Sequence, residues 1–363
     1  MEKKNKVLYA ASTQSHLERF HMPYIEALRE HATVLTMANG NEVDFSIPFD
    51  KHFFSLTNLR IILKIRKILK REKFDSILVH TTLAAFLIRA ALIGVHHRPH
   101  VLNVVHGYLF AKEPRGMKDR ILLLCERLLR RQTDEIAVMN EEDRLIAQTH
   151  RLCRGEVFFL YGMGVPDSVP KLHPDIALQQ QLGLAPTDFV CTFVGELSNR
   201  KNQIFLIRAA KMLRDKKIPV KLLLVGEGNE RESLENEIQR LNLSDTVLLT
   251  GSQTPIFPYL SVTHLYVSAS RSEGLPFNIM EAMACGLPIL ASNTKGQTDL
   301  LAQTPSALYP FDDMDAFCSA VKDIYHTSKY GIEARTYPIL SQYLLNSVFK
   351  TNMKILTRGI DSL

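Results

Sequence analysis

Short apolar runs alternate with helix-like segments along most of the 363 residues of this chain. Runs typical of strands lie at 6–12, 32–37, 76–80, 100–106, 135–139 and 157–161, and the pattern starts again at 189–196, 220–228, 246–251, 264–270 and 287–292. Strands this apolar are buried on both faces, and strands separated by helices pair in parallel. The sequence therefore predicts an α/β protein built on doubly wound, Rossmann-like parallel sheets.

The two series of strands are separated by a segment that suits no regular element. Residues 162–174 contain glycines at 162 and 164 and prolines at 166, 170 and 174, which is typical of a linker. We expect an N-terminal domain over residues 1–165 and a C-terminal domain over residues 166–342. Two such domains would face each other across a cleft, because parallel sheets bind ligands at the carboxyl ends of their strands.

The bulk composition is typical of a globular protein and gives no sign of a membrane-spanning or disulfide-rich one. Apolar residues make up 46% and charged residues 23% of the chain, an ordinary globular balance, and no window has eighteen uninterrupted apolar residues. The N-terminus runs straight into a strand pattern, which favours a cytoplasmic protein. The five cysteines are scattered without a C-x-x-C pair, so neither a disulfide framework nor a zinc knuckle is indicated.

The positive charge is concentrated in the first half of the chain. Residues 1–165 contain 25 Lys and Arg against 18 Asp and Glu, and the remainder contains 19 against 20. Within 57–75 an amphipathic helix is predicted, with one basic and one apolar stripe, and a second basic cluster consists of Lys112, Arg115, Lys118, Arg120, Arg127, Arg130 and Arg131. An anionic membrane surface is one expected partner, and a solvated helix face is the alternative. Tryptophan is absent and no motif for nucleic acid occurs, so nucleic acid is not expected.

The stretch "SEGLPFNIMEAMACGLPILAS" (272–292) follows an apolar strand and places two glutamates around a helix start. Gly274 permits a tight turn and Pro276 suits the first helical position, so the free N–H groups of the first turn form an anion site. Glu273 and Glu281 flank it, and carboxylates accept hydrogen bonds from sugar hydroxyls. A ligand with a central phosphate and sugars on both sides would use this layout; a buried structural Glu281 and a helix-dipole partner at Glu273 are the alternative.

Two cations follow the strand that ends at Gly195. Arg200 and Lys201 in "FVGELSNRKNQ" suit a diphosphate whose charge grows as it leaves, although a solvated pair of loop cations is the ordinary alternative. A histidine, His106, ends another strand in "NVVHGYLFAKEP", where it could donate to a sugar hydroxyl or serve as a structural histidine.

The E-x7-E spelling "EGLPFNIME" (273–281) resembles the signature of the family 4 retaining glycosyltransferases, which have the GT-B fold. The resemblance covers most of residues 188–300 and extends more loosely over the N-terminal half. It implies that Glu273 contacts the transferred sugar, that Glu281 holds the ribose and that the cations bind the donor phosphates. The implied donor-binding residues are Gly195, Arg200, Lys201, Gly226, Glu227, Thr250, Gly251, Glu273, Gly274, Leu275, Pro276, Phe277, Asn278 and Glu281.

The chain also departs from the family pattern. Glu196 stands where many members have an arginine, so Arg200 is the expected substitute. The first loop lacks the usual glycine pair, and the residues implied to line the acceptor side are Ser12, Thr13, Gln14 and His16. Similar H-G-aromatic segments occur in exopolysaccharide and capsule enzymes, which implies that His106 lies near the transferred sugar. The implied catalytic residues are Glu273, Lys201, Arg200 and His106. In this fold a helical tail such as 343–363 packs back on the N-terminal domain.

The resemblance implies transfer of a sugar, with retention, from a nucleotide-sugar donor such as a UDP-sugar to a lipid-linked saccharide or a growing polysaccharide. No catalytic metal or other cofactor is expected: the D-x-D at Asp313–Asp315 opens a helix and "HHRPH" (96–100) has no defined geometry. A soluble transferase or phosphorylase acting on a free sugar or glucan, a nucleotide-sugar epimerase and a dinucleotide-dependent oxidoreductase are the alternatives. The last lacks its glycine fingerprint.

Overall fold

The computed structural model describes residues 4–50, 55–114, 116–170, 172–302, 307–328 and 335–360. The chain forms two compact units, which are considered separately below. Unit 1 comprises residues 1–164 and 343–363, and unit 2 comprises residues 165–342.

Unit 1 contains a seven-stranded sheet with the order β3-β2-β1-β4-β5-β6-β7, in which all neighbouring strands are parallel. Its strands are β1 (Lys6–Thr13), β2 (Thr33–Asn39), β3 (Phe45–Ser46), β4 (Ser76–His80), β5 (His100–Val105), β6 (Glu135–Val138) and β7 (Val157–Phe159). The strand order changes direction between β1 and β4: β2 and β3 extend the sheet on the side of β1, and β5, β6 and β7 extend it on the side of β4. Such a switch point is where open parallel sheets bind ligands.

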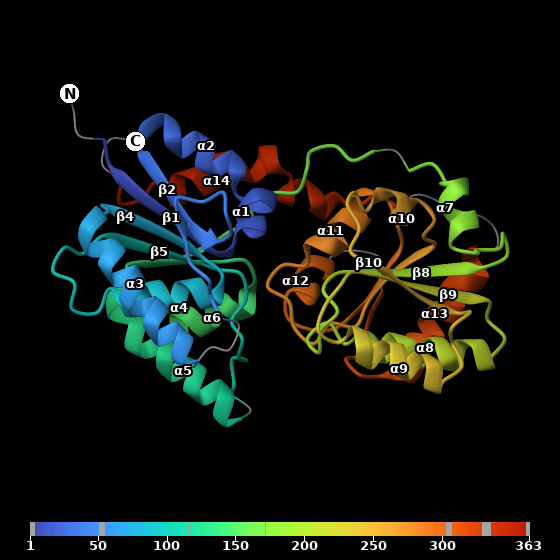
Figure 1. Cartoon of the computed structure of the whole chain (residues 1–363). Helices are drawn as coiled ribbons and strands as arrows, with labels where there is room; N and C mark the ends of the chain where they lie inside the picture. Colours follow the sequence, from blue (N-terminus) through green and yellow to red (C-terminus); the bar gives the residue numbers. More distant parts are fainter. Residues whose placement is uncertain are drawn as a thin grey trace. The chain divides into compact units, whose positions relative to one another are not determined.

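Helices cover both faces of this sheet (Figure 1). They are α1 (Gln14–Phe20), α2 (Met22–His31), α3 (Leu56–Glu72), α4 (Thr82–Ala91), α5 (Met117–Leu129), α6 (Glu141–Thr149) and α14 (Leu345–Leu356), with a 3-10 helix at Arg130–Gln132. The neighbouring helices α3, α4 and α5 lie on one face, and α1, α2 and α14 lie on the other. On α3 the expected apolar stripe, which includes Ile61 and Ile65, is buried, whereas Lys64, Lys67 and the rest of the basic stripe are exposed.

Helix α14 joins unit 1 although it lies at the far end of the chain. The amide of Asn352 is buried and donates to the hydroxyl of Tyr24 at 2.9 Å and to the carbonyl of Gly162 at 2.8 Å. The ring of Phe349 stacks on Tyr24 at 5.1 Å between ring centroids. Gly164 has a positive φ of 91° and lies against Leu345 of α14. A Cβ added to Gly164 would lie only 2.7 Å from the Cα of Leu345.

Unit 2 contains a six-stranded parallel sheet with the order β10-β9-β8-β11-β12-β13. The strands are β8 (Phe189–Val194), β9 (Val220–Val225), β10 (Val247–Gly251), β11 (Leu265–Ser268), β12 (Ile289–Ser292) and β13 (Ala307–Tyr309). The helices are α7 (Ile176–Gln181), α8 (Gln203–Asp215), α9 (Arg231–Arg240), α10 (Phe257–Ser261), α11 (Phe277–Ala284), α12 (Gln297–Leu301) and α13 (Met314–Ser328), with a 3-10 helix at Pro338–Tyr343.

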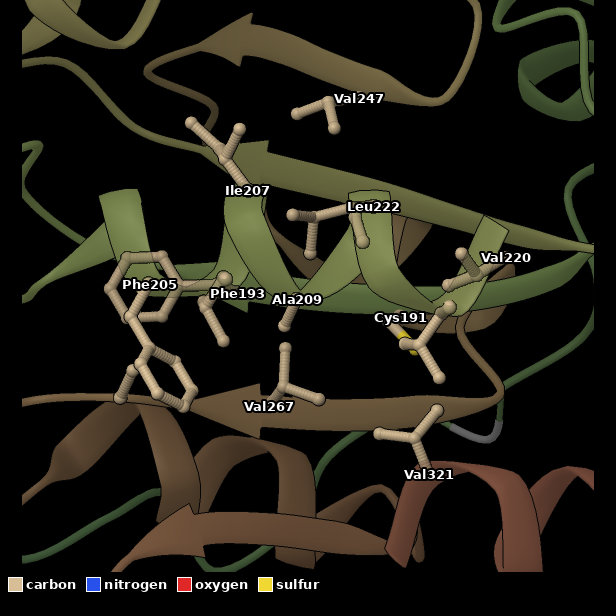
Figure 2. Packing of buried hydrophobic residues seen from close by; sticks show 14 of the residues in the cluster. Cys191, Phe193, Phe205, Ile207, Ala209, Val220, Leu222, Val247, Val267 and Val321 are labelled. Carbon is tan, nitrogen blue, oxygen red and sulfur yellow. The ribbon is translucent and has the colours of Figure 1, made fainter. Parts of the chain in front are cut away.

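The core of unit 2 packs helix α8 against the sheet (Figure 2). Phe205 and Ala209 of α8 meet Phe193 of β8 and Val267 of β11, and Val321 of α13 packs against the same cluster. All these side chains are buried, which holds the carboxyl ends of β8 and β11 in place.

The predicted fold class, two Rossmann-like α/β domains with parallel sheets, is confirmed by these two sheets. The strands β3 and β13 are absent from the sequence prediction, because β3 has only two residues and β13 ends directly before Pro310. The D-x-D lies at the start of α13, where Asp313 accepts a hydrogen bond from the backbone N–H of Ala316 at 2.9 Å. All five cysteines are free thiols. In the described part of the chain, none of the helices combines the length and apolar character needed to cross a bilayer.

Candidate active site

Two loops at the carboxyl ends of adjacent strands of unit 2 bring charged residues together. The loop after β8 contains Arg200 and Lys201, and the loop after β11 contains Glu273; β8 and β11 pair directly in the sheet. These residues are 72 to 73 positions apart in sequence. The parallel topology thus produces a cluster that sequence proximity could not.

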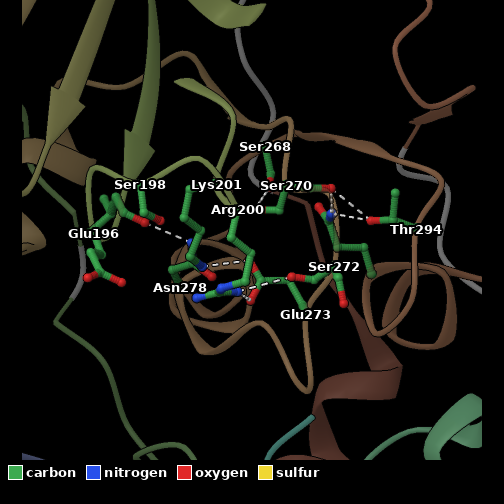
Figure 3. A network of polar contacts seen from close by, with 12 residues as sticks. Glu196, Ser198, Arg200, Lys201, Ser268, Ser270, Ser272, Glu273, Asn278 and Thr294 are labelled. Carbon is green, nitrogen blue, oxygen red and sulfur yellow. Dashed lines mark hydrogen bonds and ion pairs between the residues drawn. The ribbon is translucent and has the colours of Figure 1, made fainter. Parts of the chain in front are cut away.

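Glu273 accepts hydrogen bonds from both cations (Figure 3). Its Oε1 lies 2.6 Å from Nζ of Lys201 and its Oε2 lies 2.8 Å from the guanidinium of Arg200. Lys201 is 8% and Glu273 6% exposed, whereas Arg200 remains partly open to solvent. Arg200 also donates to the carbonyl of Ser272 at 3.0 Å, so the guanidinium links both loops.

The electrostatics of the cluster keep Glu273 ionised. Burial opposes ionisation of its carboxyl, but the charges of Lys201 and Arg200 outweigh burial and lower the pKa of Glu273 below its usual value. Burial also lowers the pKa of Lys201, and the nearby Glu273 only partly offsets this effect. The cluster carries one carboxylate and two cations, so its net positive charge favours an anionic ligand.

Further contacts hold the loop after β11 in place, through residues that were not predicted from the sequence. Arg271 donates through its backbone N–H to the carbonyl of Arg200 at 2.9 Å and through its guanidinium to the side chain of Asn202 at 2.9 Å. The carbonyl of Ser270 accepts hydrogen bonds from Ser292, Thr294 and Gln297, which lie on or after β12. Polar side chains at the ends of neighbouring strands were the available signal for this network.

Three of the predicted glycines meet at the carboxyl edge of β8, β9 and β10. The N–H of Gly226 donates to the carbonyl of Gly251 at 2.8 Å, and a Cβ on Gly226 would lie 1.9 Å from the carbonyl oxygen of Gly195. All three have positive φ angles, of 150° for Gly195, 154° for Gly226 and 76° for Gly251. Only glycine allows this close approach of three backbones.

Helix α11 begins one residue later than predicted, with Pro276 as its N-cap residue. Asn278 in its first turn donates to the carbonyl of Val194 at 2.7 Å, which fixes the helix start against the end of β8. Glu281 is half-buried on the same helix. The left-handed glycine beside this turn is Gly296, with φ 78°, and it packs against the carbonyls of Glu273 and Gly274.

The remaining residues that were predicted to bind the sugar donor differ in their burial and in their partners. The hydroxyl of Thr250 is buried without a hydrogen-bond partner in this structure. Glu227 is exposed and pairs with Arg231 at 2.6 Å, which engages its carboxylate within the protein. Leu275 and Phe277 are half-buried on either side of Pro276, and their backbones form the turn into α11.

In unit 1 the predicted residues divide into two groups. His16 and His106 come together, with ring centroids 4.8 Å apart. The side chain of Ser12 bonds Thr81 at 2.6 Å, and Gln14 is tied to Glu18 and to the backbone of Glu42. Thr13 is the residue before α1 and accepts from the hydroxyl of Ser15. Ser12 and Gln14 therefore hold the first loop in place in this structure.

His21 and His80 lie beside His16 and His106 and were missed. His80 is the last residue of β4, as His106 directly follows β5, so the argument that singled out His106 applied to it equally. His21 lies between α1 and α2, where no strand pattern marks it.

Unit 2 thus has cations, glycine-lined backbone, a helix start and carboxylates around one edge of a parallel sheet. Cations and free N–H groups bind phosphates, whereas carboxylates accept hydrogen bonds from hydroxyls. Two Rossmann-like domains, one of them with such a site, define the GT-B class of sugar-transferring enzymes.

Comparison with known families agrees with this class. A model described as glycosyl transferases group 1 matches residues 175–337, and a model described as glycosyl transferase 4-like matches residues 6–140. The chain therefore contains a glycosyl transferase 4-like domain followed by a glycosyl transferases group 1 domain.

Individual proteins are similar over most of the chain. The Bacillus subtilis protein named "Putative glycosyltransferase EpsD" is 28% identical over 349 residues, which is 91% of each chain. The UDP-Gal:alpha-D-GlcNAc-diphosphoundecaprenol alpha-1,3-galactosyltransferase of Escherichia coli is 27% identical over 280 residues, 73% of this chain and 70% of the relative. The fold is similar to that of Anabaena HepE in complex with UDP-glucose, with a TM-score of 0.77, 19% identity and coverage of 97% of this chain and 99% of the other.

Proposed function

We propose that this glycosyltransferase moves a hexosyl residue from a UDP-sugar to a lipid-linked saccharide or a growing polysaccharide, with retention of the anomeric configuration. The observation that carries the proposal is the buried cluster of Glu273 with Lys201 and Arg200. The donor named for the E. coli relative and the UDP-glucose bound to HepE support a uridine nucleotide.

The donor would bind on unit 2. Lys201 and Arg200 use only part of their donor capacity on Glu273, so N–H groups remain for the two phosphates. The start of α11 and the glycines around Gly226 would hold the diphosphate backbone, while Glu281 would accept from the ribose. Glu273 would accept from hydroxyls of the transferred sugar, because a carboxylate has lone pairs beyond the two used here.

The same cluster bears on the route of the reaction. Both oxygens of Glu273 accept hydrogen bonds from cations, which weakens the carboxylate as a nucleophile. We therefore propose attack by the acceptor hydroxyl on the face from which the phosphate leaves, which retains the configuration. Lys201 and Arg200 would stabilise the charge that develops on the departing diphosphate.

A lipid-linked acceptor fits an exposed apolar stripe on α5. Met117, Ile121, Leu124 and Leu128 follow helical spacing and are 70%, 41%, 55% and 67% exposed. The basic residues Lys118, Arg120, Arg127, Arg130 and Arg131 lie on and after this helix, whereas Arg115 of the predicted cluster lies outside the described residues. An apolar stripe flanked by cations is typical of a helix that lies on an anionic membrane. We propose that unit 1 meets the membrane peripherally through α5.

The test is a screen of nucleotide sugars with the full-length protein. UDP-sugars should raise the melting temperature, and nucleotide sugars with other bases should not. With an α-linked UDP-sugar and a lipid diphosphate-linked acceptor, the product should be an α-glycoside by nuclear magnetic resonance. A β-glycoside would refute retention.

The same screen separates the other activities. Free UDP together with an epimerised sugar, formed without acceptor, would identify an epimerase instead. Efficient transfer to a free sugar or glucan, with no use of the lipid-linked substrate, would identify a soluble transferase.

A further inference from the structure

Four histidines and a tyrosine pack together in unit 1, at the carboxyl edge of its sheet. His16 lies on α1, His21 between α1 and α2, His80 at the end of β4 and His106 after β5. Their rings are in contact, with centroid distances of 5.0 Å between His16 and His21 and 4.1 Å between His21 and His80. His21 and His80 are fully buried, whereas His16 and His106 are half-buried.

The cluster leaves several ring nitrogens without partners. The Nε2 atoms of His16, His21 and His80 are buried and make no hydrogen bond. A buried polar atom without a partner destabilises the fold, because it has lost its hydrogen bonds to water. The unpartnered nitrogens of His16 and His21, in neighbouring rings, therefore indicate a site that a ligand completes.

We propose that His16, His21 and His106 bind a divalent transition-metal ion, with Zn²⁺ as the expected occupant. One nitrogen of each ring lies within 4.8 Å of the other two. With Zn–N bonds of about 2.0–2.1 Å, a tetrahedral ion holds its nitrogen ligands about 3.4 Å apart. Modest rotation of the three side chains closes the difference.

Tyr9 and His80 are placed to orient two of the three ligand rings. The Nδ1 of His21 lies 2.9 Å from the hydroxyl of Tyr9, which leaves its Nε2 for the metal. The Nε2 of His106 lies 3.2 Å from Nδ1 of His80, which leaves the Nδ1 of His106 outside that bond. Metal-bound imidazoles commonly donate their second N–H to such a partner, so Tyr9 and His80 are positioning residues.

The chemistry of the rings also fits. Neutral imidazole is the form that binds metal, and ring nitrogens favour Zn²⁺ and similar ions over Mg²⁺ or Ca²⁺. Three protein ligands leave the fourth tetrahedral position for water or for an oxygen of a ligand.

The inference is tested by direct binding to the full-length protein, prepared without a polyhistidine tag and freed of metal with a chelator. Titration with Zn²⁺ by calorimetry should give one site per chain, and Co²⁺ should show the visible absorption of a tetrahedral centre. His16→Ala, at a half-buried position, should weaken Zn²⁺ binding more than tenfold and abolish that absorption. Tyr9→Phe should weaken binding about tenfold, since it removes only the group that orients His21.

The matched control is His96→Ala, which removes a histidine outside the cluster and should bind Zn²⁺ as the wild type does. Absence of stoichiometric binding in the wild type, or unchanged binding in His16→Ala, would overturn the inference. Thermal stabilisation of each variant by the UDP-sugar reports on unit 2, so failure of the metal site is distinguishable from failure of the proposed transferase function.

Discussion

Glu273 shows how far a single residue can be understood from sequence. Its place before a helix start suggested contact with a sugar, but the spacing said nothing about its partners. In the structure its two oxygens are held by Lys201 and Arg200 from another loop. The same limit applies to Arg271, whose contacts with the backbone and side chains of 199–202 depend wholly on the pairing of β8 with β11.

Substitution of Lys201 tests the role of the cation in stabilising the leaving group. Lys201→Ala should lower kcat by about 10²–10³-fold and change KM for the donor much less, because charge grows on the diphosphate only as the bond breaks. Initial rates at varied donor concentration give both constants. Lys216→Ala, at an exposed lysine in the same unit, is the control and should match the wild type. Equal kinetics for both variants would remove Lys201 from the site.

The pH dependence of stability tests the ionised state of Glu273. The pKa of Glu273 is lowered on folding, so its stabilising effect is present above the unfolded pKa and is lost as the pH falls through the folded pKa. Glu273→Gln should cost about 2 kcal/mol at pH 7, because the two cations lose their charged partner. The difference between variant and wild type should shrink as the pH falls below 4.5.

Urea unfolding followed by circular dichroism at several pH values measures this difference. Glu232→Gln, at an exposed position on α9, should show no comparable cost at pH 7. A cost for Glu273→Gln that stays constant down to about pH 3, well into the range where carboxylates protonate, would contradict the ionised pair.

At the scale of elements, the glycines at strand ends and the amphipathic helix α5 give the clearest testable effects of substitution. The family resemblance only implied that Gly226 binds the donor, whereas the structure gives a specific reason for a glycine: the carbonyl of Gly195 occupies the space of a side chain. The strands were predictable because each central strand is a buried apolar run, whereas β3 has only two residues and β13 ends directly before Pro310.

Gly226→Ala should destabilise unit 2 by about 3 kcal/mol or more, because the new Cβ meets backbone that cannot move aside. Gly183→Ala is a matched control, since Gly183 also has a positive φ, of 63°, but a Cβ there would meet no atom within 4 Å. The control should cost only about 1–2 kcal/mol for the left-handed conformation. Thermal melts compare the two, and equal losses would refute the close-packing argument.

If the apolar stripe of α5 binds the membrane, replacing its leucines with charged residues should weaken that binding. The double variant Leu124→Glu/Leu128→Glu should reduce co-sedimentation with phosphatidylglycerol vesicles at least tenfold, because carboxylates oppose both insertion and the anionic surface. Ile176→Glu, at a position 59% exposed on α7 of unit 2, is the control. Vesicle binding that survives in the double variant would assign the stripe to another role.

At the scale of the whole molecule, the chain returns to unit 1 for its last helix. Asn352 is 1% exposed and joins α14 to Tyr24 and to Gly162. The apolar spacing of 343–363 predicts a helix, but nothing local in it specifies the partner.

Asn352→Ala should destabilise unit 1 by about 1–3 kcal/mol, because two buried acceptors lose their donor. Hydrogen exchange followed by mass spectrometry resolves the units: peptides of unit 1 should exchange faster, and those of unit 2 should be unchanged. Lys350→Ala, at an exposed position on the same helix, is the control. Faster exchange spread equally over both units would show that α14 stabilises more than unit 1.

The sequence by itself determined the fold class, the alternation of strands and helices and the motif around Glu273, because apolar periodicity and turn residues act over a few neighbouring positions. Only the tertiary structure decided which distant side chains meet. The pairing of β8 with β11 joins Lys201 to Glu273, and the edge of the unit 1 sheet gathers His16, His21, His80 and His106. Such contacts follow from strand order and register, which are set by burial over the whole sheet and leave no local mark in the sequence.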